Sequence, residues 1–532
     1  MDHFTITFRP DGKQVSIHSG ATLIEAAGQA GIILNSVCGG KGTCKKCLVY
    51  LEPEARAVLA CQYRVERDLI VTVPAGSRFF EQRILSEGVV SQSAIDPDIY
   101  KDYLPAGSDA AIFGVAVDIG TTTVVAKLMD MRDGRCCATE AALNPQARFG
   151  DDVVSRIAYA QGESQYAHLH KAILDCINSL VEGLCRKVGI ETDRICEMCI
   201  VGNTTMSHVF LKLPIAQLGQ APYRAWSLEA HDVPAVDLGM RMNPAGNVHT
   251  VENIAGFVGA DTTAVALACD IDSAEEMTLI VDIGTNGEIV LGTKDRLYAA
   301  SCAAGPALEG ARITCGSRAT EGAIEAVVVN GDDIGLDVIG DCPPRSICGS
   351  GLIDAAAVML DLGVIDRTGR FAEPQELEAK LPPAIFSRIF EHEGRPAFRL
   401  AGTVNARQGH VFLTQGDIRQ MQLAKGAIRA GIRLLQQRVG LEDGDIRHVL
   451  LAGAFGNYIR SASALRIGLL PAVGVEKIRF VGNAAASGAQ MVLISRECRR
   501  QAGRLAHKMK YVEIAHEPDF QMVFADSMFF DG

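Results

Sequence analysis

The stretch Cys38-Gly39-Gly40-Lys41-Gly42-Thr43-Cys44-Lys45-Lys46-Cys47, together with Cys61, decides how the N-terminal part of the chain folds. Its spacing is C-x5-C-x2-C-x13-C, so three cysteines share one short loop and a fourth follows at a distance. Three glycines lie between the first two cysteines. Because glycine has no Cβ and adopts positive φ freely, such a loop can wrap closely around a bound group. The pattern therefore indicates that four thiolates converge on one site.

This spacing predicts a [2Fe–2S] cluster with Cys38, Cys44, Cys47 and Cys61 as its ligands. It is close to the plant-type pattern, C-x4-C-x2-C with a distant fourth cysteine. A structural zinc site is the alternative, because C-x2-C is also a zinc-ligand spacing. Zinc ligands usually come as two separated short pairs, however, so we favour iron and sulfide.

Composition limits the class of protein. A chain of 532 residues is too long for one core and predicts three or four domains. The balance of 51 basic and 63 acidic residues gives a net charge of −12, which argues against nucleic-acid binding or an anionic membrane surface. The sequence shows no secretory signal and no apolar run of about 18 residues. We therefore expect a cytoplasmic protein that does not enter a membrane.

Cysteine is frequent throughout the chain. The 16 cysteines are too scattered for a disulfide framework and fit a reducing compartment. Cys196 and Cys199 form a second C-x2-C within an apolar run. They are therefore predicted to be packed thiols of a buried strand.

The residues around the cysteine loop predict a small α/β domain. The expected elements are a hairpin of residues 4–8 and 15–17, a helix over 21–30 that starts near Thr22, and strands over 48–51 and 69–73. This is the β-grasp order of a ferredoxin, and residues 1–78 resemble one. Residues 79–110 have weak periodicity and are interrupted by Asp96-Pro97 and Leu104-Pro105, so we expect a linker there. A flexible linker lets an electron carrier move between partners.

A repeated motif dominates the rest of the chain. A buried strand leads into Asp118-Ile119-Gly120-Thr121-Thr122, and another leads into Asp282-Ile283-Gly284-Thr285-Asn286-Gly287. A tight glycine turn presents backbone N–H groups to an anion, and threonine hydroxyls add donors. The aspartate can hold Mg²⁺ through water. Two copies of the motif predict a duplicated fold that binds phosphate groups from both sides.

Further turns follow other predicted strands. Gly453 and Gly456 follow the strand 449–452, Gly482 and Asn483 follow a strand from residue 480, and residues 201–205 carry a similar Gly-Asn pair in the first half. Helices are expected from residue 349 to residue 362 and from a cap at residues 416–418 to residue 440. The sequence contains neither a P-loop motif nor a strand-borne G-x-G-x-x-G motif.

These turns resemble the ATP-binding core of the actin, hexokinase and Hsp70 superfamily, a duplicated RNase H-like fold. The resemblance assigns residues 118–122 to a first phosphate turn and residues 282–287 to a second. It assigns Gly453 and Gly456 to the adenosine-binding turn. It assigns Gly482 and Asn483 to the second connecting motif. Residues 201–205 are assigned to the equivalent position in the first half. We expect one half over residues 111–273 and the other over residues 274–532.

Taken whole, the chain resembles the reductive activators of corrinoid proteins. The resemblance implies an enzyme that uses ATP, Mg²⁺ and a [2Fe–2S] cluster to reduce cob(II)alamin of a corrinoid protein to cob(I)alamin, with Asp118 and Asp282 in catalytic roles. It implies an external low-potential electron donor and admits a homodimer. Only Cys498 follows residue 348, so the extra C-terminal clusters of some relatives are not expected.

Three other functions fit less well. An activator of a radical dehydratase is the main alternative, but such activators lack a fused ferredoxin domain. A sugar or acetate kinase would share the ATP-binding core without needing a cluster. A passive electron carrier would not need the large ATP-binding part.

Overall fold

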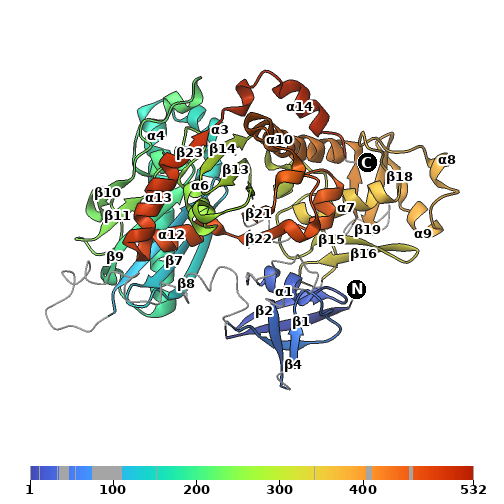
Figure 1. Ribbon diagram of the computed structural model, residues 1–532, viewed down its shortest axis with the longest axis horizontal. Coiled ribbons are helices and arrows are strands. Elements are labelled where there is room, and N and C mark those ends of the chain that lie inside the picture. Colours follow the sequence, from blue (N-terminus) through green and yellow to red (C-terminus); the bar gives the residue numbers. More distant parts are fainter. Residues whose placement is uncertain are drawn as a thin grey trace.

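The computed structural model shows a small N-terminal domain beside a larger body with two lobes (Figure 1). It describes residues 2–10, 12–30, 32, 34, 47–53, 56–74, 111–150, 152–340, 342–402, 410–453 and 459–530. The predictions for Cys38, Cys44, Gly456 and the linker 79–110 lie outside the described residues.

The described residues of the N-terminal domain form a five-stranded sheet with one helix. Its strand order is β2-β1-β5-β3-β4, and β1 pairs antiparallel with β2 but parallel with β5. The elements are β1 (His3–Arg9), β2 (Lys13–His18), α1 (Leu23–Gln29), β3 (Leu48–Glu52), β4 (Arg56–Leu59) and β5 (Leu69–Thr72). The predicted β-grasp fold is confirmed, and the structure adds β4, which the sequence analysis did not predict.

Helix α1 begins where the sequence predicts because Thr22 caps it. The Thr22 hydroxyl accepts a hydrogen bond from the backbone N–H of Glu25 at 3.3 Å, and the Glu25 carboxylate accepts one from the N–H of Thr22 at 2.7 Å. Such a cap contributes about 1 kcal/mol to stability. Leu23, Ala26 and Ala27 are buried in the core of the domain. The helix is thereby fixed just before the cysteine loop.

Two six-stranded sheets form the larger body. The first has the order β10 (His231–Pro234), β11 (Asn247–Thr250), β9 (Ile195–Gly202), β6 (Phe113–Ile119), β7 (Thr123–Asp130), β8 (Cys136–Leu143). The second has the order β22 (Ile478–Gly482), β21 (His448–Ala452), β12 (Thr278–Ile283), β13 (Gly287–Thr293), β14 (Arg296–Cys302), β23 (Met509–Tyr511). Each sheet has an antiparallel run of three strands whose first strand also pairs in parallel with a later one. The predicted internal repeat is confirmed.

The sheet orders correct one sequence assignment. Residues 201–205 were expected to hold the same place in the first half as residues 482–483 in the second. Strand β9 lies beside β6 as β21 lies beside β12, however, so residues 201–205 correspond to the turn at Gly453. The counterpart of α12 (Ala484–Ile494) is α6 (Ala260–Ala268), since the two helices follow β22 and β11.

The shared Gly-Asn pair explains the wrong assignment. Asn203 accepts a hydrogen bond from the N–H of Met206 at 3.0 Å, and Asn483 accepts one from the N–H of Ala486 at 3.0 Å. Asparagine is a favoured N-cap wherever a helix begins. The two pairs are therefore alike because both cap helices, although those helices occupy different places in the repeat.

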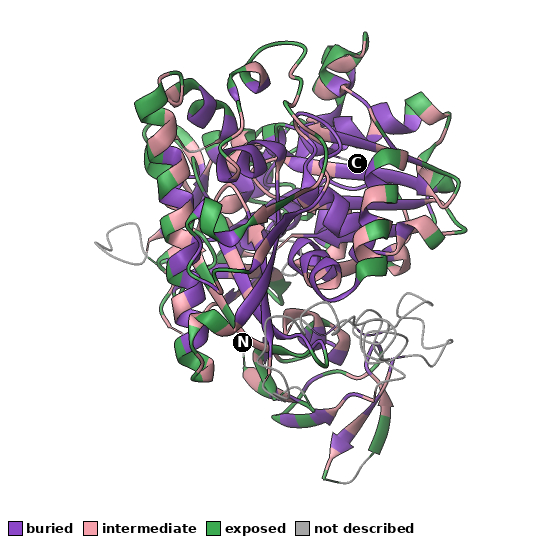
Figure 2. Ribbon diagram, turned by 90° about the vertical axis from the view of Figure 1, so that its left-hand side faces the viewer, coloured by how far each residue is buried: buried purple, intermediate pink, exposed green. Residues whose placement is uncertain are grey.

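Helices α6 and α12 pack together where the two halves meet. A Cβ at Gly488 of α12 would lie only 2.1 Å from the backbone oxygen of Ala264 in α6, so this glycine permits the close approach. One apolar core contains residues of both helices and both sheets. Figure 2 shows the buried positions concentrated in the central strands and the helices beside them. The halves therefore share a core at this junction.

The other helices lie around this core. They are α3 (Val153–Tyr159), α4 (Glu163–Val188), α5 (Thr204–Phe210), α7 (Gly349–Asp361), α8 (Pro374–Leu377), α9 (Pro383–Phe386), α10 (Gln415–Val439), α11 (Ser461–Arg466), α13 (Arg496–Lys508) and α14 (Phe520–Ser527). The predicted helices α7 and α10 are confirmed. The cap of α10 is Thr414, which forms a capping box with Asp417, so the start predicted at residues 416–418 was slightly late. Within the described part of the chain, no helix has the length and apolar character needed to cross a membrane.

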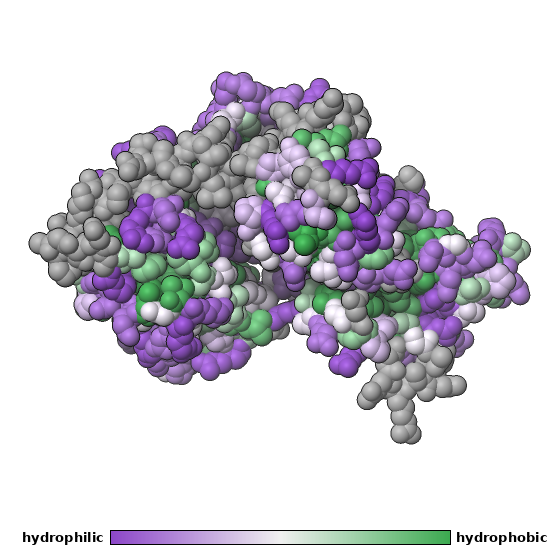
Figure 3. Space-filling model, turned by 90° about the horizontal axis from the view of Figure 1, so that it is seen from below, coloured by the Kyte–Doolittle hydropathy of each residue, from purple (hydrophilic) through white to green (hydrophobic). Residues whose placement is uncertain are grey.

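Two small sheets are insertions in the second half. They consist of β15 (Ala323–Asn330), β16 (Asp333–Val338) and β17 (Ser346–Ile347), and of β18 (Ile389–His392), β19 (Arg395–Ala401) and β20 (Val411–Thr414). The N-terminal domain contacts the first of them, because the carboxylate of Asp337 in β16 bonds to Nε2 of His3 and lies 4.0 Å from Nδ1 of His18. Figure 3 shows the molecule from below, where hydrophobic patches of the surface are interrupted by hydrophilic residues.

Candidate functional site

A cavity of about 490 Å³ lies between the halves and is lined by both phosphate turns. The predicted residues that line it are Asp118, Gly120, Thr121, Thr122, Asp282, Gly284, Thr285, Asn286, Gly453 and Asn483. Gly287 and Gly482 do not line it. A Cβ at Gly287 would lie 2.7 Å from the sulfur of Cys302, so this glycine serves the packing of β13 against β14. Gly482 has φ of +68° and ends β22 just before the cap of α12.

The first phosphate turn is held by side chains from three other elements. Its own backbone closes with a hydrogen bond from the N–H of Gly120 to the oxygen of Thr123 at 3.0 Å. The amide of Asn144 donates to the oxygen of Gly120 at 2.9 Å. The buried guanidinium of Arg156 donates to the oxygen of Thr121 at 2.6 Å, and the amide of Asn203 donates to the Thr121 hydroxyl at 3.0 Å. These bonds fix the conformation of the turn.

The second phosphate turn is braced mainly by backbone. The N–H of Gly284 donates to the oxygen of Asn286 at 3.0 Å, and the N–H of Gly305 donates to the oxygen of Thr285 at 3.0 Å. Gly453 has φ of +92°, and a Cβ there would lie 2.6 Å from a carboxylate oxygen of Asp282. The turn after β21 therefore needs glycine to pass so close to the aspartate.

Four carboxyl groups gather in the cavity. Burial, together with the charge of Asp261, raises the pKa of both Asp118 and Asp282 to about 7. Burial raises the pKa of Asp261 to about 6, against hydrogen bonds from Thr262. Burial and the charges of Asp261 and Asp282 raise the pKa of Glu288 well above its usual value. The cavity thus holds more negative charge than it can solvate, which favours a cation among these groups.

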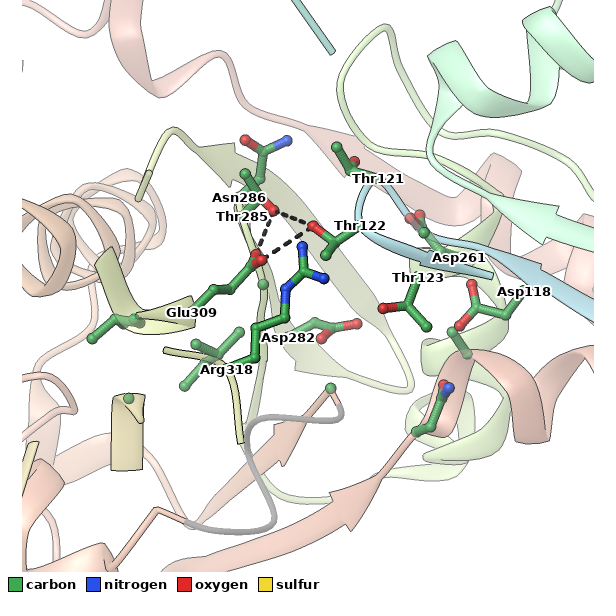
Figure 4. Close-up of a pocket in the computed structure, with 18 of the residues that line it drawn as sticks. Asp118, Thr121, Thr122, Thr123, Asp261, Asp282, Thr285, Asn286, Glu309 and Arg318 are labelled. Atoms are coloured by element: carbon green, nitrogen blue, oxygen red, sulfur yellow. Dashed lines mark hydrogen bonds between the residues drawn. The ribbon is translucent and has the colours of Figure 1, made fainter. Parts of the chain in front are cut away.

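A fifth carboxylate, Glu309, connects the two turns. It accepts a hydrogen bond from the Thr122 hydroxyl at 3.1 Å and another from the Thr285 hydroxyl, and the two hydroxyl oxygens are 3.4 Å apart. Figure 4 shows the three side chains converging, with Arg318 extending into the same cleft. The donors of both turns therefore meet at one point, which an anion can occupy.

Two of the predicted cluster ligands lie together in the N-terminal domain. The sulfurs of Cys47 and Cys61 are 3.3 Å apart, and both residues are buried. Two thiols at this distance can be ligands of one iron, so the described residues fit the cluster. Cys61 also lines a second cavity of about 330 Å³, whose opposite wall includes Ile459 and Phe480. This side of the domain thus faces strand β22 and Ile459, which follows the predicted adenosine turn.

Several residues of the cleft were not predicted from the sequence. Asn144 and Arg156 brace the first turn from a loop and a helix that carry no recognisable motif. Asp261 lies in the first turn of α6, directly after a Gly-Ala pair. Its importance could have been recognised only if α6 had been identified as the counterpart of α12. Glu309 ends the short helix η8 (Pro306–Glu309), and nothing in its local sequence indicates that it reaches both turns.

Three domain-family models match most of the chain. Residues 276–532 match the domain family described as the C-terminal domain of RACo, the ASKHA domain. Residues 113–274 match the RACo middle region. Residues 4–75 match a 2Fe-2S iron-sulfur cluster binding domain. The three matches follow one another along the chain in the order in which the structure presents its parts.

Individual relatives agree with these matches. The corrinoid activation enzyme RamQ of Eubacterium limosum is 33% identical over 98% of this chain and 98% of its own length. A Co(II) methylated amine-specific corrinoid protein reductase of Methanosarcina barkeri is 23% identical over 72% of this chain and 70% of its own length. A solved structure of a reductive activator for corrinoid, iron-sulfur protein has a TM-score of 0.73 and 32% identity, covering 99% of this chain and 98% of that one. The chain therefore belongs to the family of reductive activators of corrinoid proteins.

Proposed function

We propose that this protein uses ATP to transfer one electron from a [2Fe–2S] cluster to the inactive cob(II)alamin of a corrinoid protein, giving cob(I)alamin. The observation that carries the proposal is that one chain combines a buried cysteine pair in a ferredoxin fold with a cleft lined by two phosphate turns. The names of the full-length relatives support the same activity. Activation of a radical dehydratase is not favoured, because these relatives match the ferredoxin domain as well as the ATPase part.

In this proposal the cluster is ligated by Cys38, Cys44, Cys47 and Cys61. ATP binds in the cleft with Mg²⁺, and Asp118 and Asp282 act on it through the ion and its water. The nucleotide contacts proposed are Gly120, Thr121, Thr122, Gly284, Thr285, Asn286, Gly453, Gly456 and Asn483, with Gly287 and Gly482 supporting the turns.

The need for ATP follows from redox energetics. Plant-type clusters have potentials near about −400 mV. A tenfold change in a one-electron equilibrium corresponds to about 59 mV, so each 100 mV of unfavourable potential costs roughly 2.3 kcal/mol. An acceptor that is harder to reduce than the cluster therefore requires another source of free energy. ATP binding or hydrolysis in the adjoining cleft can supply it.

The remaining parts of the proposal concern organisation and partners. The proposed units are a ferredoxin domain over residues 1–78, a linker over 79–110, and two ATPase halves over 111–273 and 274–532. An external low-potential donor reloads the cluster after each transfer. We further propose a cytoplasmic location and allow for a homodimer, as in the interpretation of the sequence.

The direct test of the proposal measures the oxidation state of the cobalt. The anaerobically reduced protein is mixed with Mg·ATP and a corrinoid protein held in the Co(II) state, and the Co(I) absorption band is recorded. We expect the band only when both ATP and the cluster are present. The matched variant is Cys61→Ser, which should lose reduction of cobalt but keep ATP hydrolysis, because the cleft is built from other residues. Equal reduction without ATP, or by this variant, contradicts the proposal.

Metal analysis tests the cluster separately. A [2Fe–2S] centre requires about two irons and two sulfides per chain after anaerobic purification. Cys47→Ser and Cys61→Ser should both lower the iron content, because the two sulfurs lie together in the structure. A colourless protein that contains zinc would show that the cysteines form a structural zinc site instead.

A further inference from the structure

The position of Glu309 is fixed by the backbone on both sides of it. Gly305, which precedes η8, has φ of +76° and donates its N–H to the oxygen of Thr285 in the second phosphate turn. Gly310, which follows Glu309, has φ of +81°, and a Cβ there would lie 2.0 Å from the backbone oxygen of Ser317. Two left-handed glycines and a bond to the phosphate turn thus aim the half-buried Glu309 side chain into the cleft.

The hydrogen bonds of Glu309 mark the place of the terminal phosphate. Its carboxylate oxygens accept from Thr122 of the first turn and from Thr285 of the second. Among the hydrogen bonds of the described residues, only those of Glu309 join one carboxylate to the hydroxyls of both turns. A phosphate bound by both turns must approach the same two hydroxyls. It therefore lies directly next to this carboxylate.

A carboxylate next to a phosphate is unfavourable unless a cation or a hydrogen-bond donor lies between them. Water is the smallest such donor, and it can donate one hydrogen bond to the carboxylate while its oxygen faces phosphorus. The other acids of the cleft, Asp118, Asp261, Asp282 and Glu288, crowd together, and burial and the charge of Asp261 raise the pKa of the other three, as expected of groups near a shared cation. Glu309 bonds instead to the threonines, so it is free of that role.

From this geometry we propose that Glu309 is the catalytic base of ATP hydrolysis, an inference that rests on ATP being the ligand of the cleft. The oxygen of a water held by Glu309 forms a bond to the terminal phosphorus. The bond between that phosphorus and the oxygen bridging to the second phosphate breaks, and ADP leaves with the electron pair. The proton of the water passes to the Glu309 carboxylate. Arg318, the cation among the residues that line the cleft, balances the charge that develops on the phosphate.

The decisive variant is Glu309→Gln, which keeps the size of the side chain and one hydrogen-bond acceptor but cannot take up a proton. General-base catalysis contributes about 10²- to 10⁴-fold to a rate. We therefore expect kcat for ATP hydrolysis to fall at least about 100-fold while KM and the Kd for Mg·ATP change less than about threefold. Nucleotide recovered from the loaded variant should be ATP rather than ADP. The matched control is Glu321→Gln, because Glu321 is an exposed acid that follows on the same segment but does not line the cleft.

A second variant separates catalysis from structure. Glu309→Asp keeps the acid but withdraws it by one methylene, so it should retain part of the rate that Glu309→Gln loses. If Glu309 only tethers the turns, the Glu309→Gln variant will hydrolyse ATP at a rate within about threefold of that of the unmodified protein, or its KM will change rather than its kcat. Either result overturns the proposal.

The readouts also distinguish this inference from the proposed function, because hydrolysis and binding are measured without a corrinoid protein. A protein that hydrolyses ATP through Glu309 but reduces no cob(II)alamin would refute the proposed function alone. A protein that binds no ATP would refute both.

Discussion

The two phosphate turns begin with the same four residues but differ in length and charge. Strand pairing leaves residues 120–123 in the first hairpin loop and residues 284–286 in the second, so the first loop is one residue longer. Opposite Asp118 lies the apolar Val125, whereas opposite Asp282 lies Glu288. The two halves thus share the Asp-Ile-Gly-Thr turn but differ in what surrounds it. The second half, which also supplies Glu309, carries more of the acids that face the cleft.

The largest expected effect comes from the turn aspartates. Asp118→Ala and Asp282→Ala should each lower kcat/KM for ATP hydrolysis about 100-fold or more, because a metal ion contributes several kcal/mol to phosphoryl transfer. We expect the loss to be greater for Asp118, since no acid lies opposite it, while Glu288 can partly replace Asp282. Steady-state rates of ATP hydrolysis at varied Mg²⁺ concentration measure the loss in each variant.

Matched controls for these variants exist in the next hairpin of each half. The control variants are Asp133→Ala and Asp295→Ala. Asp133 lies between β7 and β8, Asp295 lies between β13 and β14, and both side chains are exposed. Neither control should change hydrolysis. If Asp118→Ala and Asp282→Ala also left hydrolysis and nucleotide binding unchanged, the assignment of both turns would be wrong.

The loop glycines should differ more sharply than their sequences suggest. A Cβ at Gly120 would lie 2.7 Å from the backbone oxygen of Thr123, whereas a Cβ at Gly284 would lie 3.5 Å from its nearest neighbour, the oxygen of Asn286. Overpacking of this kind costs about 1–3 kcal/mol. Gly120→Ala should therefore lower the Tm of the nucleotide-free protein, and Gly284→Ala should leave it nearly unchanged. Equal Tm shifts in the two variants would mean that the loops are equivalent after all.

The sequence predicted the parts that depend on local pattern. Alternating apolar residues and the Thr22 cap fixed the hairpin and helix of the N-terminal domain, and the repeated Asp-Ile-Gly-Thr motif located both turns, because strand and turn preferences are local. Strand β4 escaped prediction since Arg56–Leu59 is short and partly polar.

Contacts between distant segments were not predictable in this way. Glu309 reaches Thr122 across 187 positions of the chain, and Arg156 reaches Thr121 across 35. Such contacts depend on how the two sheets and their helices pack, which no single segment encodes. The same limit explains why α6 was not recognised as the counterpart of α12.

The crowded acids predict an unusual pH dependence of stability when neither Mg²⁺ nor nucleotide is bound. The pKa of Asp118 and of Asp282 is about 7 in the folded protein, above the usual 3.8. Between pH 8 and pH 6 the folded protein therefore takes up protons that the unfolded chain does not, so the free energy of unfolding rises as pH falls. Each proton contributes at most about 1.4 kcal/mol per pH unit, and solvent in the cleft reduces this.

We expect the free energy of unfolding to rise by about 1 kcal/mol from pH 8 to pH 6, which is measured as a higher Tm in the presence of a chelator. Asp118→Asn and Asp282→Asn should each flatten the rise, because neither amide titrates. Saturating Mg·ADP should flatten it as well, since a bound cation stabilises the ionised groups. A Tm that falls over this range by the same amount in all three proteins would show that these carboxyls do not titrate there.

The smallest expected effects come from the threonine hydroxyls, which test how far the two turns act alike. Thr122→Val and Thr285→Val each remove one donor to the proposed phosphate position. Each hydroxyl otherwise donates to the carboxylate of Glu309, so binding exchanges one charged acceptor for another, and the net value of the bond is about 0.5–1.5 kcal/mol. Each variant should therefore weaken Mg·ATP binding about 2- to 10-fold, by similar amounts, because both hydroxyls meet at Glu309. Thr139→Val, on an exposed position of β8, is the control and should bind normally. A large loss from one variant and none from the other would mean that a single turn holds the terminal phosphate. The water between Glu309 and the phosphate would then be constrained by one half of the molecule only.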